Sequence, residues 1–191
     1  MDRNIKFGIA PVAINLFAGP GSGKSTTAAA VFAQLKLAQI NCEMAREFAK
    51  EKVWERSYPV LEDQLYVFAK QAHRMKILED QVDVIITDSP LYLSLVYGDT
   101  STTFGNLVKE IHFNSYINFN YFIQRTKPFH QSGRIQTETE ATDLDRGIKL
   151  MLDEFKEPYT ILDGDSHAAT AIFHEYVTWR MKWDPDFKMD I

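Results

Sequence analysis

A chain of 191 residues is long enough for one α/β domain with a sizeable buried core. Its 45% hydrophobic and 25% charged residues are the usual mixture of a globular protein, which excludes disordered and fibrous classes. The net charge of −5 disfavours a protein that coats nucleic acid, although it allows a local basic groove. The single cysteine, Cys42, excludes an internal disulfide and fits a small buried residue in a reducing compartment.

The start of the chain shows no targeting pattern. Residues 1–8 form a short, charged segment, which does not match a secretory signal. No apolar run approaches the roughly 20 residues that a transmembrane helix needs. We therefore expect a soluble, cytoplasmic protein with no membrane partner.

The strongest local signal lies in residues 12–26. An apolar run at 9–18 predicts a buried strand, a glycine-rich turn follows, and an alanine-rich helix is expected at 24–37. A strand, a glycine loop and a helix N-terminus in this order are typical of a P-loop. Its backbone N–H groups and helix end bind phosphate.

The spacing of this motif is Ala18-x4-Gly23-Lys24-Ser25, with Ala18 in place of the usual first glycine. Lys24 would reach the β- and γ-phosphates of a nucleoside triphosphate, and the Ser25 hydroxyl would ligate Mg²⁺. ATP and Mg²⁺ are therefore the expected cofactors. The residues expected to bind the nucleotide are Gly19, Pro20, Gly21, Ser22, Gly23, Lys24, Ser25 and Thr26.

The next elements alternate strands with helices. A short strand at 39–43 and a charged helix at 44–56 are followed by Pro59, which ends that helix because the residue before a proline avoids helical geometry. Apolar residues at three- and four-residue steps predict a long helix at 60–80, and a buried strand follows at 83–88. This alternation predicts a single domain, residues 1–191, with a three-layer α/β/α P-loop NTPase fold around a mostly parallel five-stranded sheet.

Asp88 ends that last strand, in the place of the Walker B carboxylate that holds Mg²⁺ or orients an acceptor hydroxyl. The alternative is an aspartate that caps the turn before Pro90. Position 89 is serine, not the glutamate with which motor ATPases activate water, and no Asn-Lys-x-Asp motif for guanine is present. Both features favour phosphoryl transfer to a substrate over hydrolysis or GTP switching.

The second half of the chain continues the alternation. Residues 98–105 are small and polar and predict a loop, and Thr137 with Glu140 forms a capping box that opens a helix. The expected elements are a helix at 106–115, a strand at 118–124, a helix from 137 to 155, a strand at 159–163 and a helix ending near 183.

A basic loop separates the strand at 118–124 from the capped helix. Arg125 and Arg134 flank this loop, and closing arginines can neutralise the charge on a transferring phosphoryl group while a lid expels water. We expect a lid at about residues 125–136. The alternative is a solvated basic surface loop.

Glu43, Arg46 and Glu47 follow the second strand, at the edge of the sheet where such folds bind ligands. A carboxylate here could accept the proton of an attacking hydroxyl, and Arg46 could clamp a substrate phosphate or sugar. The alternative is a set of ion pairs on an exposed helix. Glu43, Glu47 and Asp88 all remain candidates for the base.

Together these motifs resemble P-loop nucleoside and nucleotide kinases. The segment Glu-Met-Ala-Arg-Glu-Phe from Glu43 is similar to one in nicotinamide-riboside-kinase-like ATPases. The run Lys-Pro-Phe…Gly-Arg-x-Gln-Thr-Glu-x-Glu-Ala, residues 127–141, is similar to a nucleotide-kinase lid and the helix that follows it. Phage kinases that phosphorylate 5-hydroxymethyluracil in DNA share this layout. The resemblance implies that Lys24, Ser25 and Asp88 carry ATP·Mg and that the lid holds Arg125 and Arg134. It also implies that Glu43 is the acceptor-side base and that adenine lies against the turn at 164–165.

Three functions remain open on these residues. The first is an ATP-dependent kinase acting on a nucleoside, a nucleotide or a modified DNA base. The second is a small ATPase coupled to a partner protein, and the third is a nucleotide-binding regulator without turnover. The oligomeric state is open, and a homodimer is one possibility. Four aromatic residues could stack a base or belong to the core: Trp54, Tyr58, Tyr66 and Tyr92.

Overall fold

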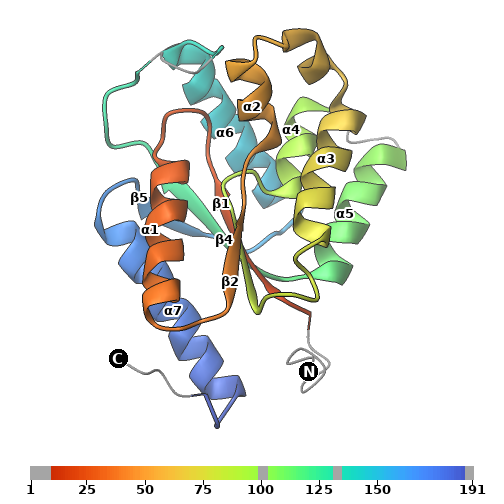
Figure 1. Ribbon diagram of the computed structural model, residues 1–191. Helices are drawn as coiled ribbons and strands as arrows, with labels where there is room; N and C mark the ends of the chain where they lie inside the picture. The colour runs from red at the N-terminus through yellow and green to blue at the C-terminus, as the bar shows by residue number, and fades with distance from the viewer. Residues whose placement is uncertain (1–9, 99–102, 131–134, 188–191) are drawn as a thin grey trace.

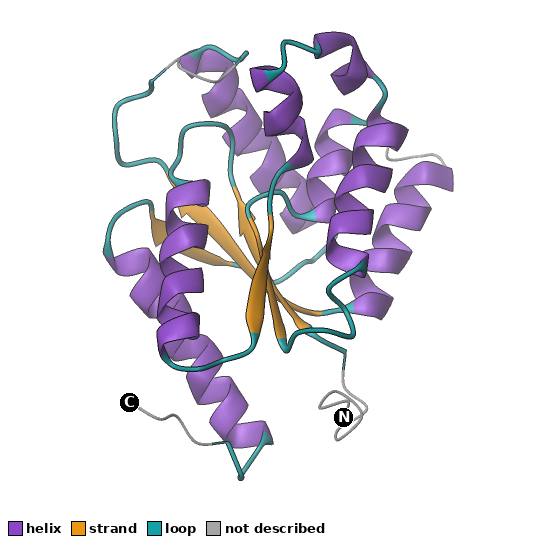
Figure 2. Ribbon diagram, in the orientation of Figure 1, coloured by secondary structure: helices purple, strands orange, loops and turns teal. Residues whose placement is uncertain are grey.

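The computed structural model describes residues 10–98, 103–130 and 135–187. Five parallel strands form one sheet in the order β2-β3-β1-β4-β5. Helices cover both faces of this sheet (Figure 1, Figure 2), which confirms the predicted three-layer α/β/α architecture. The strands are β1 (Val12–Phe17), β2 (Cys42–Ala45), β3 (Val84–Thr87), β4 (Ile117–Gln124) and β5 (Thr160–Asp163).

The helices divide between the two faces of the sheet. In Figure 1, α1 and α7 lie on one side, and α3, α4 and α5 lie on the other. The second layer also includes α6, because Ile148 and Leu152 pack in the same core as Ala13. The helical elements are α1 (Lys24–Leu37), α2 (Phe48–Trp54), η2 (Tyr58–Glu62), α3 (Gln64–Lys76), η3 (Leu91–Leu93), α4 (Ser94–Tyr97), α5 (Thr103–Ser115), α6 (Glu138–Glu154) and α7 (His167–Trp183).

β1 is the central strand, and all six of its residues are buried. Val12, Ile14 and Leu16 pack toward α1 and α7, whereas Ala13 and Phe17 pack toward the opposite layer. A strand covered on both faces needs an apolar residue at nearly every position, which is why the segment reads as a continuous hydrophobic run. The loop that follows β1 is thereby supported from both sides.

One polar residue, Asn15, interrupts this run, and its amide nitrogen has two partners. The Asn15 amide donates to the side-chain oxygens of Asn118 at 2.8 Å and Asn120 at 2.9 Å on β4. Asn120 in turn donates to Glu157 at 2.9 Å, and the same carboxylate oxygen lies 3.1 Å from Nε2 of His112. A slip of β4 along β1 would leave these buried groups unpaired, so the network specifies the register of the two strands.

The bounds of β2 and α3 differ from the predictions. β2 extends to Ala45, where the sequence predicted a helix from residue 44, because Ala45 pairs with Thr87 of β3. The predicted helix at 60–80 is two elements. The side chain of Asp63 accepts the N–H of Tyr66 at 3.0 Å, so α3 begins at Gln64 after the short turn η2.

The elements of the C-terminal half follow the predictions closely. The capping box of α6 is present, with the Glu140 carboxylate accepting the Thr137 N–H at 2.7 Å. α5 begins at Thr103, inside the predicted loop at 98–105, of which residues 99–102 lie outside the described residues. In the part of the chain that the structure describes, the helices are too short or too polar to cross a bilayer.

Candidate functional site

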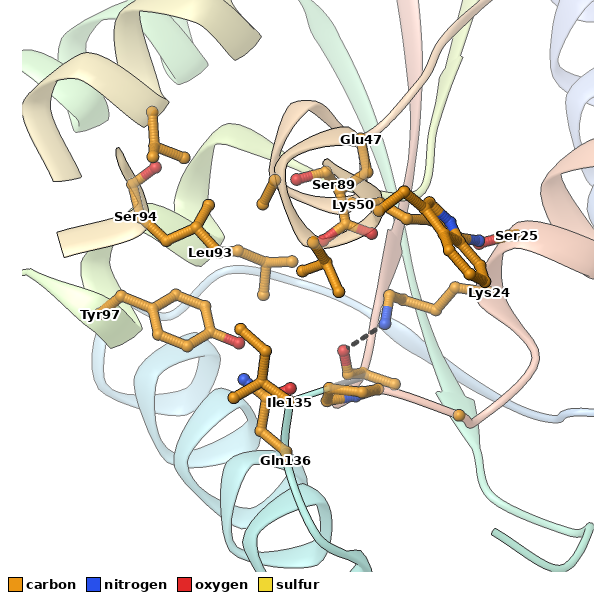
Figure 3. Close-up of a pocket in the computed structure, with 18 of the residues that line it drawn as sticks. Lys24, Ser25, Glu47, Lys50, Ser89, Leu93, Ser94, Tyr97, Ile135 and Gln136 are labelled. Atoms are coloured by element: carbon orange, nitrogen blue, oxygen red, sulfur yellow. Dashed lines mark hydrogen bonds between the residues drawn. The ribbon is translucent and has the colours of Figure 1, made fainter. Parts of the chain in front are cut away.

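The candidate site is a cleft at the end of the sheet where β1 and β3 finish. Its volume is about 430 Å³, and its walls come from the P-loop (residues 18–25), α2, η2, α3, α4 and the segment Ile135–Gln136. Figure 3 shows Lys24, Ser25 and Glu47 on one side of this cleft and Tyr97, Ile135 and Gln136 on another. The carboxyl ends of parallel strands are the usual ligand-binding edge of such a sheet.

The P-loop takes a conformation that needs glycine. Gly21 has φ 82° and Gly23 has φ 109°, values in the left-handed region that disfavours other residues. A Cβ at Gly21 would also lie 3.0 Å from the Arg125 guanidinium and from the Phe129 ring. The loop is therefore packed beneath the first residues of the predicted lid.

A second loop presses on the P-loop from the end of β5. Gly164 donates its N–H to the Gln124 carbonyl at 2.8 Å, and a Cβ on Gly164 would overlap the carbonyl oxygen of Ser22. Only glycine allows this approach of two backbones. The predicted adenine-side turn at 164–165 thus lies directly against the P-loop.

The variant Gly164→Ala should lower the free energy of unfolding by about 1–3 kcal/mol, because one of the two backbones must shift. Gly147→Ala is the matched control. Nothing lies within 4 Å of a Cβ at Gly147, so we expect that change to stabilise α6 by about 0.5–1 kcal/mol. Urea unfolding of both variants checks the pair, and equal effects would contradict the tight contact.

Lys24 lies half-buried where the loop meets α1. Its Nζ donates to the carbonyl oxygens of Ala18 at 2.7 Å and Gly19 at 3.0 Å. Burial lowers the pKa of Lys24 below its ordinary value, while the negative charges of Glu47, Asp88 and Asp145 oppose this shift. A phosphate would give this desolvated ammonium a charged partner in place of neutral carbonyls.

Ser25 and Asp88 form an oxygen-rich pair beside it. The Ser25 hydroxyl donates to Oδ2 of Asp88 at 2.5 Å, and Oδ1 of Asp88 is buried without a hydrogen-bond partner. Carboxylate and hydroxyl oxygens are the ligands that Mg²⁺ prefers, so these two residues fit the predicted metal. Among the described residues, the carboxylate of Asp88 accepts from Ser25 and from no backbone N–H of the turn before Pro90.

Replacing Asp88 by asparagine should lower turnover at least about 100-fold and raise the Mg²⁺ concentration needed for half-maximal rate, because one metal-binding charge is lost. Steady-state rates across a magnesium titration measure both effects. Asp80→Asn, an exposed residue before β3, is the control and should match the wild type. An unchanged magnesium dependence in Asp88→Asn would remove Asp88 from the metal site.

Glu47 brings a carboxylate into the cleft. It precedes α2 directly and lines the cleft together with Lys24 and Lys50. Burial raises the pKa of Glu47, the charge of Asp88 adds to this rise, and Lys24 opposes it. Nζ of Lys50 lies 3.5 Å from the Ser25 hydroxyl. The sequence patterns did not single out this lysine.

The other two predicted acceptor-side residues lie elsewhere. Glu43 is inside β2, where its carboxylate accepts the N–H of Met44 at 3.0 Å. Arg46 is exposed and lines a separate groove of about 230 Å³ with Arg74. The structure therefore brings Glu47, rather than Glu43 or Arg46, to the described wall of the P-loop cleft.

The predicted lid is partly described. Arg125 follows β4, and its Nη2 donates to Oδ2 of Asp145 on α6 at 3.1 Å. Ile135 and Gln136 line the cleft, whereas Arg134 lies outside the described residues. Sequence reasoning missed Asp145.

Apolar side chains form another part of the cleft wall. Of the four aromatic residues considered for base stacking, Trp54 lines the cleft. Its surface is 63% exposed. Tyr92 is instead a core residue, fully buried and stacked on His112 with ring centroids 3.9 Å apart. The other apolar residues of this wall are Val53, Leu61, Val67, Leu93 and Ile135.

The sheet is parallel, a P-loop follows its central strand β1, and Asp88 follows the neighbouring strand β3. These features define a P-loop NTPase fold. The chain belongs to the family described as an AAA domain, whose model matches residues 13–169. No protein of curated function matches the chain in sequence.

Two solved structures of deoxyadenosine kinase from M. mycoides share the fold. One, with the products dCMP and a flexible dCDP bound, is 16% identical with a TM-score of 0.58, and the match covers 87% of this chain and 100% of that one. The other, with bound dATP, is 15% identical with a TM-score of 0.55, over 87% and 99% of the two chains. This likeness confirms the predicted resemblance to P-loop nucleoside kinases at the level of the fold.

Proposed function

We propose that the protein is an ATP-dependent kinase that transfers the γ-phosphate to a hydroxyl group of a nucleoside, a nucleotide or a modified base such as 5-hydroxymethyluracil in DNA. One observation carries the proposal. The carboxylate of Glu47, with a raised pKa, lies in the same cleft as Lys24 and Ser25, and the charge of Asp88 acts on it. A base beside a phosphate-binding loop is the arrangement that phosphoryl transfer to an alcohol needs.

The same carboxylate favours a hydroxyl acceptor over a phosphate acceptor. An alcohol must lose a proton as it attacks, so a nearby base assists the reaction. A phosphate acceptor is already ionised at neutral pH, needs no base, and would be repelled by Glu47. The apolar wall around Trp54 and Leu93 also suits a neutral nucleoside or base better than a charged group. The nucleoside kinases that share the fold support the same acceptor class.

The residues divide the reaction between them. Lys24 and the P-loop N–H groups bind the β- and γ-phosphates, and Ser25 with Asp88 would hold Mg²⁺, which supplies neutralising positive charge. The acceptor oxygen forms a bond to the γ-phosphorus while the bond to the β–γ bridging oxygen breaks and ADP leaves. Glu47 accepts the acceptor's proton, and Arg125 donates to phosphate oxygens.

The lid at about residues 125–136 belongs to this proposal, as part of a single domain spanning 1–191. Arg134 would reach the transferring phosphoryl group when the lid closes. The described ends of the lid support such a role, because Phe129 contacts the P-loop at Gly21 and Ile135 lines the cleft.

An acceptor panel with Mg·ATP tests the proposal. The panel contains free nucleosides, nucleoside monophosphates, nicotinamide riboside and DNA carrying 5-hydroxymethyluracil, each analysed by mass spectrometry. We expect one phosphate on a hydroxyl acceptor in the wild type and none with Lys24→Ala. Phosphate added to a monophosphate's own phosphate would contradict the hydroxyl assignment. Accumulation of ADP with every acceptor unchanged would favour the partner-coupled ATPase, and tight ATP binding without any product would favour the regulator.

A further inference from the structure

We infer that Asp145 of α6 is a positioning residue that sets the Arg125 guanidinium against the P-loop for a phosphate group of the bound nucleotide. One carboxylate oxygen of Asp145 accepts the Gly19 N–H at 2.5 Å, and the other accepts from Nη2 of Arg125 at 3.1 Å. Asp145 thus joins the first turn of the P-loop to the residue that begins the lid. This inference rests on the proposed binding of ATP.

The remaining donors of Arg125 point to the ligand. Its Nε and Nη1 are buried and have no hydrogen-bond partner, and Nη1 lies 3.0 Å from the position of a Cβ on Gly21. A buried guanidinium with unpaired donors is unfavourable unless an acceptor reaches it. A phosphate oxygen on the P-loop is such an acceptor, and the planar fork of an arginine suits it.

The helix carrying Asp145 is itself fixed to the P-loop. A Cβ on Gly19 would overlap the carbonyl oxygen of Ala141, one turn before Asp145. The side chains of Arg125 and Asp145 are only 14% and 17% exposed, so solvent screens their pairing little. Rigid support of this kind is what holds a phosphate-binding donor in its productive position.

The variant Asp145→Asn separates the two contacts. The amide oxygen can still accept the Gly19 N–H, but the amide nitrogen faces Arg125 as a second donor. Asp145→Ser is the companion variant, because it keeps a small acceptor and places no amide against Arg125. We expect each to weaken Mg·ATP binding about tenfold, measured by calorimetry without an acceptor. Asp143→Asn on the same helix, where Asp143 and Arg146 form an exposed pair at 3.0 Å, is the control and should bind as the wild type does.

A double-mutant cycle with Arg125→Met identifies the route of the effect. If Asp145 acts through Arg125, then Asp145→Asn should cost little further affinity once Arg125 is replaced. Additive losses would contradict the inference, because a merely structural role would weaken both backgrounds equally. Tighter ATP binding by Asp145→Asn would also overturn it and would make the carboxylate a competitor of phosphate. Failure of the wild type to bind Mg·ATP would contradict the proposed function itself, whereas wild-type binding with unchanged variants contradicts only the role of Asp145.

Discussion

Replacing Lys24 by alanine should reduce phosphoryl transfer by about 10³-fold or more, since a charged donor to the developing phosphate charge is removed. The fold should survive, because the partners of Nζ are the P-loop's own carbonyl oxygens. Acceptor phosphorylation measured by mass spectrometry gives the rate, and Lys36→Ala, exposed near the end of the same helix, is the matched control. Retained activity in Lys24→Ala would remove Lys24 from the mechanism.

The same variant should also change the pH dependence of stability. Burial lowers the pKa of Lys24 in the folded state, so the unfolded chain binds the proton more tightly. The free energy of unfolding of the wild type should therefore rise as pH increases from that lowered pKa toward the ordinary value of 10.5. Lys24→Ala should lose this rise. Urea unfolding at a series of alkaline pH values measures the difference.

Replacing Glu47 by glutamine should lower kcat by about 10²–10⁴-fold, because the acceptor's proton loses its base while the shape of the side chain is kept. The wild-type rate should rise with pH through the pKa of Glu47, since only the ionised carboxylate accepts a proton. That pKa is raised above its ordinary value of 4.5. In the wild type, the acid limb of the pH–rate profile should therefore have its midpoint above pH 4.5. In Glu47→Gln this limb should be absent.

Glu51→Gln is the matched control for this prediction. Glu51 lies one turn further along α2, where it forms an ion pair with Arg74 at 2.6 Å outside the cleft. Its replacement should leave both kcat and the acid limb unchanged. Loss of activity in Glu43→Gln, with Glu47→Gln active, would instead return the role of base to Glu43.

The P-loop side of the cleft could be predicted because its signals are local. A buried run, a glycine turn and a helix opening at Lys24 follow one another in sequence, and the helix has the predicted bounds, Lys24–Leu37. The acceptor half could not be resolved in the same way. Which of Glu43 and Glu47 lines the cleft depends on where β2 ends, and the pairing of Ala45 with Thr87 decides that. Such pairing is a tertiary effect that local propensity does not contain.

Asp145 left a signal that the sequence reasoning overlooked. Ala141, Ile148 and Leu152 are buried on one stripe of α6, and Asp145 occupies the position on that stripe where another apolar residue is expected. A charge at a core position of an amphipathic helix indicates a buried partner. That partner, Arg125, lies 20 residues away, so only the fold shows what the charge contacts.

The order of synthesis on the ribosome makes the central position of β1 a liability. The strand emerges first, yet Asn15 finds its partners 103 and 105 residues later, and Gly19 reaches Asp145 126 residues later. Until β4 has been translated, a nascent chain presents one edge of a mostly apolar strand without a neighbour. Such an intermediate folds slowly and is prone to aggregate. Demand for chaperones should therefore be greatest before β4 has been translated, and fragments ending before β5 should lack the packing of Gly164 against the P-loop.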